Sequence, residues 1–544
     1  MNGAEVIAEI LKREGTEFLA CYPRNPVIES CAAIDIRPIL CRQERVGVGI
    51  ADGFSRIRRG KRNGVFASQH GPGIENAFAG VAQAFSENVP LLVIPGGFSA
   101  QRQYIHPTFR AAETFKPVTK WSAFVTTPGE IPGVMRRAYQ AMRSGKPGPV
   151  LVEVQTEVFD AAFEGTLDYR PVPVVRMGPD PEAVKQAAQM LLAAKNPLIW
   201  AGQGVHYAEA GDRLAALAEL IPAPVAATNP GKSAIPDTHP LSLGGSTRSR
   251  SKGYATFMGS ADLVLAIGSS LTKTSFGPAL PPGKIVIHST NDPSDVNKDY
   301  QVDGALVGDA ALVIEALIEE IGHQRRSSDP KALQALTDEV AGIKESWLAE
   351  WAKHLDSNEV PIDQYRVIGD LMKTVDRDNV IITHDSGSPR EQLLPFWQTT
   401  KAASYMGWGK STQLGYGLGL TMGAKLAAPD KLCINVMGDC SFGMTGMDIE
   451  TASRNRIGIF TIVFNNQVMA CERDVMQVST ERFNALAVGG NYAKVAEALN
   501  VASRRVEKPA DIIPTIREAI EVTEQGMPFL MEIVAKEGYD FSRY

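Results

Sequence analysis

The chain has 544 residues, and at about 150 residues per domain this length favours about three to four domains over a single core. Its hydrophobic share of 44% and charged share of 21% are close to those of an average globular protein. Lys and Arg number 55 against 61 Asp and Glu, so the formal net charge is only −6. This balance gives no electrostatic argument for a nucleic-acid partner or an anionic membrane.

The amino-terminal segment does not resemble a signal peptide, because Glu5, Glu9 and Lys12 interrupt it and its apolar residues recur at helical spacing. Apolar runs such as residues 89–94 are too short to cross a bilayer, which takes about 20 helical residues. The six cysteines show no CxxC spacing, so neither a disulfide framework nor a zinc site is indicated. We expect a soluble, cytoplasmic protein with reduced thiols.

Short apolar strands alternate with helical patterns along most of the chain. Each strand is rich in Val, Ile or Leu, and a glycine, a proline or a polar turn usually follows it. Such alternation is typical of parallel sheets covered by helices on both faces, so the predicted class is α/β with doubly wound sheets. The predicted strands span residues 64–69, 90–94, 197–201, 262–267, 284–288, 379–383, 432–437 and 459–464.

Two shifts in composition divide the chain into three units. Residues 169–181 are rich in proline, and the polar stretch 322–330 precedes a long helical pattern at 332–355. We therefore expect three α/β domains of ordinary size. They span residues 1–168, 183–322 and 358–540.

The clearest chemical pattern lies in the third unit. Gly438-Asp439-Cys440-Ser441 follows one predicted strand and Asn465-Asn466 follows the next, with a helical pattern at 447–456 between them. The two strands then run parallel and end at one edge of the sheet, where open α/β sheets bind ligands. Carboxylate and amide oxygens suit Mg²⁺, while backbone N–H groups and the Ser441 hydroxyl suit a phosphate. The pattern therefore predicts a magnesium-diphosphate site.

These motifs resemble the thiamine diphosphate (ThDP) signature of the superfamily that includes acetolactate synthase, pyruvate decarboxylase and benzoylformate decarboxylase. The resemblance extends over nearly the whole chain. It implies a pyrimidine-binding first domain, a Rossmann-like middle domain and a diphosphate-binding third domain. It also implies that Asp439, Asn466 and the Val468 carbonyl bind Mg²⁺, and that Gly438, Cys440 and Ser441 lie at the diphosphate.

The first unit carries a second motif of the same superfamily. Arg42-Gln43-Glu44, followed by Ala51-Asp52-Gly53-Phe54-Ser55-Arg56, resembles its Arg-His-Glu and Ala-x-Gly-Tyr-Ala-Arg segments. By this resemblance Glu44 is the catalytic glutamate. A carboxylate bonded to the pyrimidine ring nitrogen favours the imino tautomer, which removes the proton from the thiazolium carbon.

The segment Gln69-His70-Gly71-Pro72-Gly73-Ile74-Glu75-Asn76 resembles the family's Ser-Gly-Pro-Gly-x-x-Asn turn. It follows a predicted strand and leads into a helix expected at 76–85, and its glycines allow close backbone approach to the cofactor. The resemblance implies catalytic positions for Gln69 and His70, facing the substrate. It places Gly73, Asn76 and, earlier in the domain, Pro23 at the cofactor.

Two further residues of the third unit match family positions. Leu414 resembles the bulky apolar residue that holds ThDP in a bent V shape, although an ordinary core leucine would look the same. The carbonyl that receives the aminopyrimidine would come from Thr412. Glu472, six residues beyond Asn466, matches a glutamate of decarboxylase-like and sulfoacetaldehyde acetyltransferase-like members. It is either a catalytic residue or an ordinary surface acid.

Some positions depart from the family pattern. Cys440 replaces a glycine, and if the turn needed a positive φ its Cβ would cost energy and weaken cofactor binding. Arg110 stands where acetolactate synthases carry glutamine, and it either binds a carboxylate or is a surface residue. In the middle unit residues 269–273 lack the arginine of the family's flavin-binding turn, and 202–204 is a lone GxG, so FAD is doubtful.

The resemblance implies an enzyme that uses ThDP and Mg²⁺ to break and form C–C bonds of a small 2-oxo acid, with an acetolactate synthase-like carboligase favoured. The alternatives are a 2-oxo acid decarboxylase, a sulfoacetaldehyde acetyltransferase-like enzyme, or a catalytically weak binding or regulatory protein of this fold. The resemblance further implies a homodimer or homotetramer in which Glu44 of one subunit and Asp439 of another bind the same cofactor.

Overall fold

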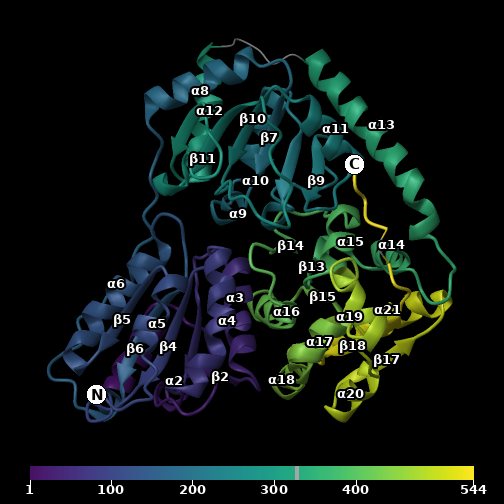
Figure 1. Ribbon diagram of the computed structural model, residues 1–544. Coiled ribbons are helices and arrows are strands. Elements are labelled where there is room, and N and C mark those ends of the chain that lie inside the picture. The colour runs from purple at the N-terminus through teal and green to yellow at the C-terminus, as the bar shows by residue number, and fades with distance from the viewer. Residues whose placement is uncertain (325–329, 539) are drawn as a thin grey trace.

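The computed structural model describes residues 1–324, 330–538 and 540–544, so part of the polar stretch 322–330 lies outside the described residues. The described residues form three six-stranded sheets, each built from parallel strand pairs and covered by helices (Figure 1). The α/β class with three doubly wound parallel sheets is thus confirmed.

The first sheet has the strand order β2-β1-β3-β4-β6-β5. Its strands are β1 (Phe18–Cys21), β2 (Arg37–Leu40), β3 (Gly64–Ser68), β4 (Leu91–Gly97), β5 (Trp121–Val125) and β6 (Val150–Gln155). The helices around it are α1 (Gly3–Arg13), α2 (Val27–Ala32), α3 (Glu44–Ile57), α4 (Pro72–Ser86), α5 (Ala111–Thr114), α6 (Ile131–Arg143) and α7 (Thr156–Asp160). The strands β3, β4 and β6 are buried along their whole length, as strands covered on both faces must be.

The middle sheet has the order β9-β8-β7-β10-β11-β12, which is the 3-2-1-4-5-6 order of a Rossmann sheet. Its strands are β7 (Pro197–Ala201), β8 (Val225–Thr228), β9 (Ser242–Ser246), β10 (Leu263–Ile267), β11 (Ile285–Thr290) and β12 (Gly304–Val307). The helices are α8 (Pro181–Ala193), α9 (Gly204–Tyr207), α10 (Gly211–Leu220), α11 (Lys252–Ser260) and α12 (Ala310–Gln324).

The third sheet has the order β14-β13-β15-β16-β18-β17. Its strands are β13 (Val380–His384), β14 (Tyr405–Met406), β15 (Leu432–Gly438), β16 (Ile459–Asn465), β17 (Ala502–Val506) and β18 (Phe529–Val534). The helices are α14 (Gln364–Thr374), α15 (Ser388–Phe396), α16 (Tyr416–Ala427), α17 (Asp439–Thr445), α18 (Ile449–Asn455), α19 (Gln477–Phe483), α20 (Tyr492–Ala498) and α21 (Ile512–Glu524), with short 3₁₀ turns η6 (Gly446–Asp448) and η7 (Ala470–Glu472).

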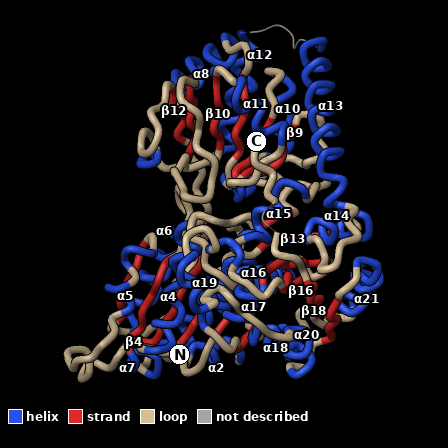
Figure 2. Tube along the Cα trace, turned by 45° about the vertical axis from the view of Figure 1, so that its right-hand side comes forward, coloured by secondary structure: helices blue, strands red, loops and turns tan. Residues whose placement is uncertain are grey.

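Two segments tie the third domain to the middle one. The long helix α13 (Pro330–Leu355) runs along the outside of the molecule between them (Figures 1 and 2). The carboxy-terminal tail returns to the middle domain, where the Arg250 N–H donates to the Ser542 carbonyl at 2.8 Å. The Trp347 indole N–H of α13 donates to the Ser542 hydroxyl at 3.1 Å.

The first and third sheets have the same topology. When the strands of each sheet are numbered along the chain, both read 2-1-3-4-6-5. Thus β1 corresponds to β13, β3 to β15, and helix α3 to α16. Each sheet has a topological switch point between its first and third strands, where open α/β sheets bind ligands.

Helices α3 and α16 pack against each other and join the first domain to the third (Figure 1). Glycines make their approach unusually close, because a Cβ at Gly53 would lie 2.1 Å from the Leu420 carbonyl. A Cβ at Gly423 would likewise lie 2.1 Å from the Ile50 carbonyl. Larger residues at these positions would force the two backbones apart.

All eight predicted strands are present, with ends shifted by a few residues. The predicted helix ends were less accurate. The helix expected at 76–85 begins at Pro72, since proline suits the first helical turn. The turn expected at Gly438–Ser441 is helical from Asp439 onward, and the pattern at 447–456 divides into η6 and α18.

Ten strands were not predicted. Some are short or polar, such as the two-residue β14 and the Arg-rich β17, but the apolar and buried strands β6 and β18 were also missed. The long helical pattern at 332–355 is confirmed as α13. Within the described residues, no helix combines the length and apolar character needed to span a membrane.

Candidate active site

Asp439 lies where β15 ends and α17 begins, at the carboxyl edge of the third sheet. Its side chain is 2% exposed, and burial raises its pKa, while nearby backbone N–H groups act in the opposite direction. One carboxylate oxygen accepts from the Cys440 N–H at 2.7 Å, and the other accepts from the Gln467 N–H at 2.8 Å. Asp439 therefore joins the turns that follow two adjacent strands, β15 and β16.

Asn466 and Val468, the other expected metal ligands, lie in the turn after β16. The Asn466 side-chain oxygen accepts from the Val468 N–H at 3.2 Å, and the Val468 carbonyl accepts from the Ala470 N–H at 2.9 Å. Each of these oxygens has a second lone pair. A carboxylate, an amide oxygen and a carbonyl are the donors that Mg²⁺ accepts in proteins, so this set fits the ion.

The same edge offers groups for a diphosphate. A Cβ at Gly438 would meet nothing within 4 Å, so the space beside this strand end is open. Ser441 is 1% exposed at the first turn of α17. Ser386, which follows β13, is also buried, and its hydroxyl has no hydrogen-bond partner among the described residues. A buried hydroxyl without a partner is costly, and a phosphate oxygen would satisfy it.

Glu44 is the first residue of α3 and is only 3% exposed. Burial raises its pKa, while its own backbone N–H and the side chain of Asn76 favour the ionised form. A Cβ at Gly73 would lie 3.6 Å from the Glu44 carboxylate. The fold therefore brings the predicted turn at 69–76 directly against Glu44.

Gln69 and His70 are half-buried at the carboxyl end of β3. The His70 ring lies 4.5 Å from the Phe98 ring, and burial together with the positive charge of Arg102 lowers the pKa of His70. This imidazole is therefore neutral at pH 7 and can accept or donate one hydrogen bond. Pro23 is exposed after β1, on the adjacent strand end.

Arg110 is half-buried and already has partners of its own. Its guanidinium forms an ion pair with Glu113 at 3.1 Å and lies over the ring of Tyr104. Arg110 was expected to be either a carboxylate-binding group or a surface residue. These contacts agree with a surface residue.

Thr412 and Leu414 lie in the turn before α16 and are half-buried. Leu414 belongs to none of the hydrophobic clusters formed by the described residues. The N–H groups of Gly415 and Gly417 both donate to the Asp385 carboxylate. Sequence reasoning missed Asp385, because its place at the switch point emerges only once the strand order is known.

Within one chain, the amino end of α3 in the first domain lies close to the α17–α18 segment of the third domain. The Arg42 N–H donates to the Asp448 carboxylate at 2.7 Å, and the Arg45 guanidinium donates to the Met444 carbonyl at 2.9 Å. These contacts place the amino end of α3, which begins with Glu44, against the α17–α18 segment, which begins with Asp439.

The structure corrects the expectation of strain at Cys440. Cys440 is the second residue of α17, and its φ is not in the left-handed region. A Cβ there has ordinary helical geometry, so the predicted reason for weak cofactor binding disappears. Glu472 is exposed at the end of η7, in the segment that follows the Asn466 turn.

A separate cavity of about 550 Å³ lies between the three domains at the carboxyl edge of the middle sheet. The lone GxG at 202–204 after β7 and residues 268–272 after β10 both line it. This is the switch point of the Rossmann order, the usual ligand position in such a sheet.

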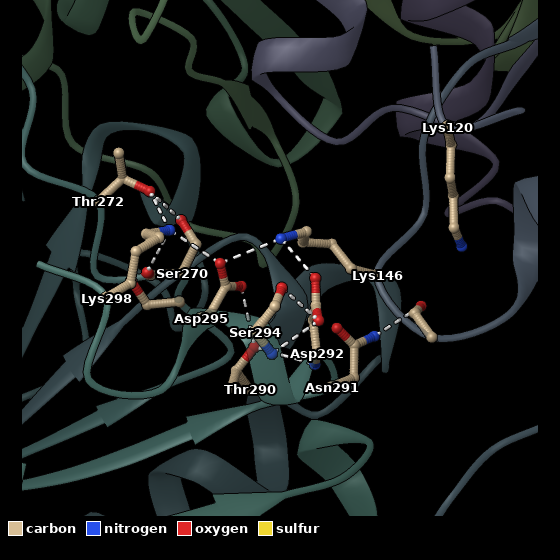
Figure 3. A network of polar contacts seen from close by, with 12 residues as sticks. Lys120, Lys146, Ser270, Thr272, Thr290, Asn291, Asp292, Ser294, Asp295 and Lys298 are labelled. Carbon is tan, nitrogen blue, oxygen red and sulfur yellow. Dashed lines mark hydrogen bonds and ion pairs between the residues drawn. The ribbon is translucent and has the colours of Figure 1, made fainter. Parts of the chain in front are cut away.

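Charged residues surround this cavity. Lys146 of the first domain pairs with Asp292 at 2.7 Å and with Asp295 at 3.0 Å (Figure 3). Arg390, reaching in from the third domain, is 3% exposed and lines the cavity, and its Nη1 has no hydrogen-bond partner among the described residues. An arginine therefore reaches this cavity, although the turn after β10 lacks one.

Three family models match successive parts of the chain. The thiamine pyrophosphate enzyme N-terminal TPP binding domain matches residues 1–116, the central domain matches 184–317, and the C-terminal TPP binding domain matches 385–533. Among similar proteins, a probable acetolactate synthase large subunit from Methanocaldococcus jannaschii is 29% identical over 566 residues, which cover 98% of this chain and 92% of that protein.

A protein of the same description from Methanococcus aeolicus is 27% identical over 559 residues, covering 98% of this chain and 92% of that protein. The glyoxylate carboligase of Escherichia coli O157:H7 is 27% identical over 560 residues, covering 98% and 93%. Because the matched models take in all three domains and both edges described above, the chain belongs to the thiamine pyrophosphate-dependent enzymes.

Proposed function

We propose that the protein is a ThDP- and Mg²⁺-dependent carboligase acting on a small 2-oxo acid, in the manner of acetolactate synthase. One observation carries the proposal: the buried Glu44 carboxylate and the Asp439–Asn466 pair lie at the carboxyl edges of two sheets that have the same topology. The similarity to acetolactate synthase large subunits and to a glyoxylate carboligase supports the reaction class.

Each edge has its own task. In the third domain, within residues 358–540, Asp439, Asn466 and the Val468 carbonyl would hold Mg²⁺. The Ser441 and Ser386 hydroxyls and the backbone at Gly438 and Cys440 would hold the diphosphate. The Thr412 carbonyl would receive the aminopyrimidine, and Leu414 would keep the cofactor bent.

In the first domain, within residues 1–168, Glu44 would bind the pyrimidine ring and exchange a proton with it, with Asn76, Gly73 and Pro23 alongside. ThDP, when bound, supplies an electron sink for cleavage of the bond to the carboxylate of a 2-oxo acid. His70 and Gln69 would orient the substrate from the same edge, and the neutral His70 suits a hydrogen bond to a carbonyl.

Glu472 motivates the alternative of a 2-oxo acid decarboxylase or a sulfoacetaldehyde acetyltransferase-like enzyme. Its segment follows the Asn466 turn, and the nearby Cys471 thiol lies 3.5 Å from the Ser388 hydroxyl at the start of α15. If Glu472 protonates the intermediate, Glu472→Gln shifts the products from aldehyde toward ligation. An unchanged product ratio would make Glu472 a surface acid.

A panel of 2-oxo acids and sulfoacetaldehyde, assayed for products with and without ThDP and Mg²⁺, tests the proposal. We expect CO₂ release and a ligated 2-hydroxy-3-oxo product from pyruvate or glyoxylate, and dependence on both additions. Aldehyde as the only product would favour the decarboxylase. Acetyl phosphate and sulfite formed from sulfoacetaldehyde and added inorganic phosphate would favour the sulfoacetaldehyde acetyltransferase-like enzyme. If no turnover occurs with ThDP bound, a catalytically weak binding protein replaces the proposal.

We also propose a homodimer or homotetramer with the active site between subunits, working in the cytoplasm. Support comes from the resemblance and, for the compartment, from six free cysteines. Mixing inactive Glu44→Ala chains with inactive Asp439→Ala chains tests the site. A shared site would recover up to about a quarter of wild-type activity in refolded mixtures of dimers. No recovery would place both edges of each site in one chain.

The cavity in the middle domain bears on FAD. Its volume and the unpaired Arg390 nitrogen are compatible with an anionic dinucleotide, while residues 269–273 lack the family arginine. We propose that flavin is not required for turnover. Flavin absorbance in the purified protein, together with activity lost on its removal, would overturn this proposal.

A further inference from the structure

The carboxylate of Asp385 occupies a central position that none of the recognised motifs includes. Asp385 directly follows β13 and is 0% exposed. One of its oxygens accepts from the N–H groups of Ser386 at 2.8 Å and Gly415 at 2.9 Å. The other accepts from the Gly417 N–H at 2.9 Å. Both carboxylate oxygens are therefore committed to backbone.

Two of these donors belong to the turn that carries Thr412 and Leu414. Gly415 has φ +86°, and its carbonyl accepts from the Thr445 hydroxyl at 2.9 Å. A Cβ at Gly415 would lie 2.5 Å from that hydroxyl oxygen. The turn is thus held at its N–H groups by Asp385 and at a carbonyl by Thr445.

Helix geometry explains why a carboxylate suits this position. Gly415 immediately precedes α16 and Gly417 is its second residue, so both N–H groups lack a partner within the helix. A negative charge at a helix amino end is also favoured by the helix dipole. Asparagine has nearly the same shape, but its NH₂ group would face one of these N–H groups, donor against donor.

We propose that Asp385 is a positioning residue that fixes the turn 412–417, and with it the Thr412 carbonyl and Leu414, for the pyrimidine half of ThDP. The inference rests on the function proposed for Thr412 and Leu414. Asp385 acts through the turn: its carboxylate accepts from backbone N–H groups and also lies beside the Ser441 side chain.

Calorimetric titration of Asp385→Asn with ThDP and, separately, with inorganic pyrophosphate, each with Mg²⁺, tests this role. We expect ThDP affinity to fall about 10–100-fold, the usual effect of losing a hydrogen bond to a charged group. Pyrophosphate lacks the pyrimidine, and removing a negative charge does not weaken the binding of an anion. Its affinity is therefore expected to fall much less than that for ThDP, with a small loss because Asp385 also accepts from the Ser386 N–H beside the proposed diphosphate site.

Two further variants make the test decisive. Asp370→Asn alters another buried carboxylate of the third domain, paired with Arg366 at 2.8 Å, and is expected to leave both affinities unchanged. Thr445→Val releases the turn from the carbonyl side and is expected to weaken ThDP alone, so it carries the test if Asp385→Asn fails to fold.

The outcomes separate the inference from the proposed function. Unchanged ThDP affinity in Asp385→Asn or in Thr445→Val would overturn the positioning role of Asp385. A loss of pyrophosphate affinity as large as the loss of ThDP affinity would overturn it too. A wild-type protein that binds pyrophosphate but not ThDP would instead contradict the proposed function itself.

Discussion

The first and third domains place different chemistry on equivalent edges of one topology. After β3 the chain turns through Gly71-Pro72 into α4, and after the equivalent β15 it turns through Gly438-Asp439 into α17. The first edge therefore presents a glycine-rich turn against Glu44, whereas the third presents a carboxylate and a neighbouring amide. A shared scaffold thus gives no function by itself, and the residues at the strand ends decide what each edge can bind.

Replacing the buried Glu44 carboxylate of the first domain separates catalysis from binding. Glu44→Gln removes the group proposed to exchange a proton with the cofactor but keeps its shape, so we expect turnover to fall about 10²–10⁴-fold, the usual range for a lost acid or base. Binding of ThDP should persist. The control is Glu75→Gln, an exposed acid on α4. Steady-state kinetics with cofactor titration check both, and a Glu44→Gln enzyme of normal turnover would contradict the assignment.

The corresponding substitution in the third domain, Asp439→Asn, should weaken the affinity for ThDP. Asp439→Asn removes the charge of the proposed metal ligand, which also accepts from the Gln467 N–H, so we expect Mg²⁺-dependent ThDP binding to weaken about 10–100-fold. Calorimetry with and without Mg²⁺ measures this change. The exposed Asp430→Asn of the same domain serves as control. Equal affinities for both variants would remove Asp439 from the metal site.

Breaking the contact between the domains should cost stability. In Gly423→Ala the new Cβ meets the Ile50 carbonyl of α3, and overpacking of this kind costs about 1–3 kcal/mol. Thermal unfolding should show a lower Tm. In Gly342→Ala, within α13, nothing lies within 4 Å of the new Cβ, and a small gain is expected. Similar Tm values for both variants would show that the glycines are not needed for packing.

The burial of Asp448, whose carboxylate accepts from the Arg42 N–H, predicts a pH effect on stability. Burial raises the pKa of Asp448 from 3.8 to about 6, so the folded protein binds its proton more tightly than the unfolded chain. This group stabilises the fold at low pH, and the contribution is lost as pH rises through about 6. Asp448→Asn should therefore gain about 1–2 kcal/mol relative to wild type between pH 4 and pH 7. Denaturant titrations at both pH values check this. If the free energies of unfolding of wild type and Asp448→Asn changed equally between the two pH values, the prediction would be contradicted.

The smallest effect is expected at Cys440. Because Cys440 already has helical backbone geometry, Cys440→Gly relieves no strain, and ThDP affinity should change by less than about twofold. Cofactor titration measures it. A tenfold tighter complex would restore the explanation by strain that the sequence suggested.

The sequence was most informative where one pattern determines one local structure. Continuous apolar runs identified the central strands. The paired motifs after β15 and β16 predicted a metal and diphosphate site, and in the fold Asp439 joins the segments that follow these two strands. The boundaries of helices were harder to place, because Gly438-Asp439 reads equally well as a turn or as the start of α17.

What the sequence could not supply depends on contacts between distant segments. Asp385 looks like any polar residue after a strand until the sheet order places it beside Gly415 and Gly417. Arg390 likewise reaches the cavity at the middle sheet from the third domain, so no local sequence motif could predict its position there. The close approach of α3 and α16 requires glycines on both helices at once.

The proposed roles of Glu44 and Asp439 are tested most directly by the rate at which the thiazolium C2 proton of bound ThDP exchanges for deuterium. Quenched-flow NMR measures this rate. If Glu44 of one edge activates a cofactor held by Asp439 at the other, the wild-type protein will exchange far faster than free ThDP. Glu44→Gln, saturated with ThDP, will then exchange at nearly the free rate. Equal exchange rates in wild type and Glu44→Gln would contradict the account.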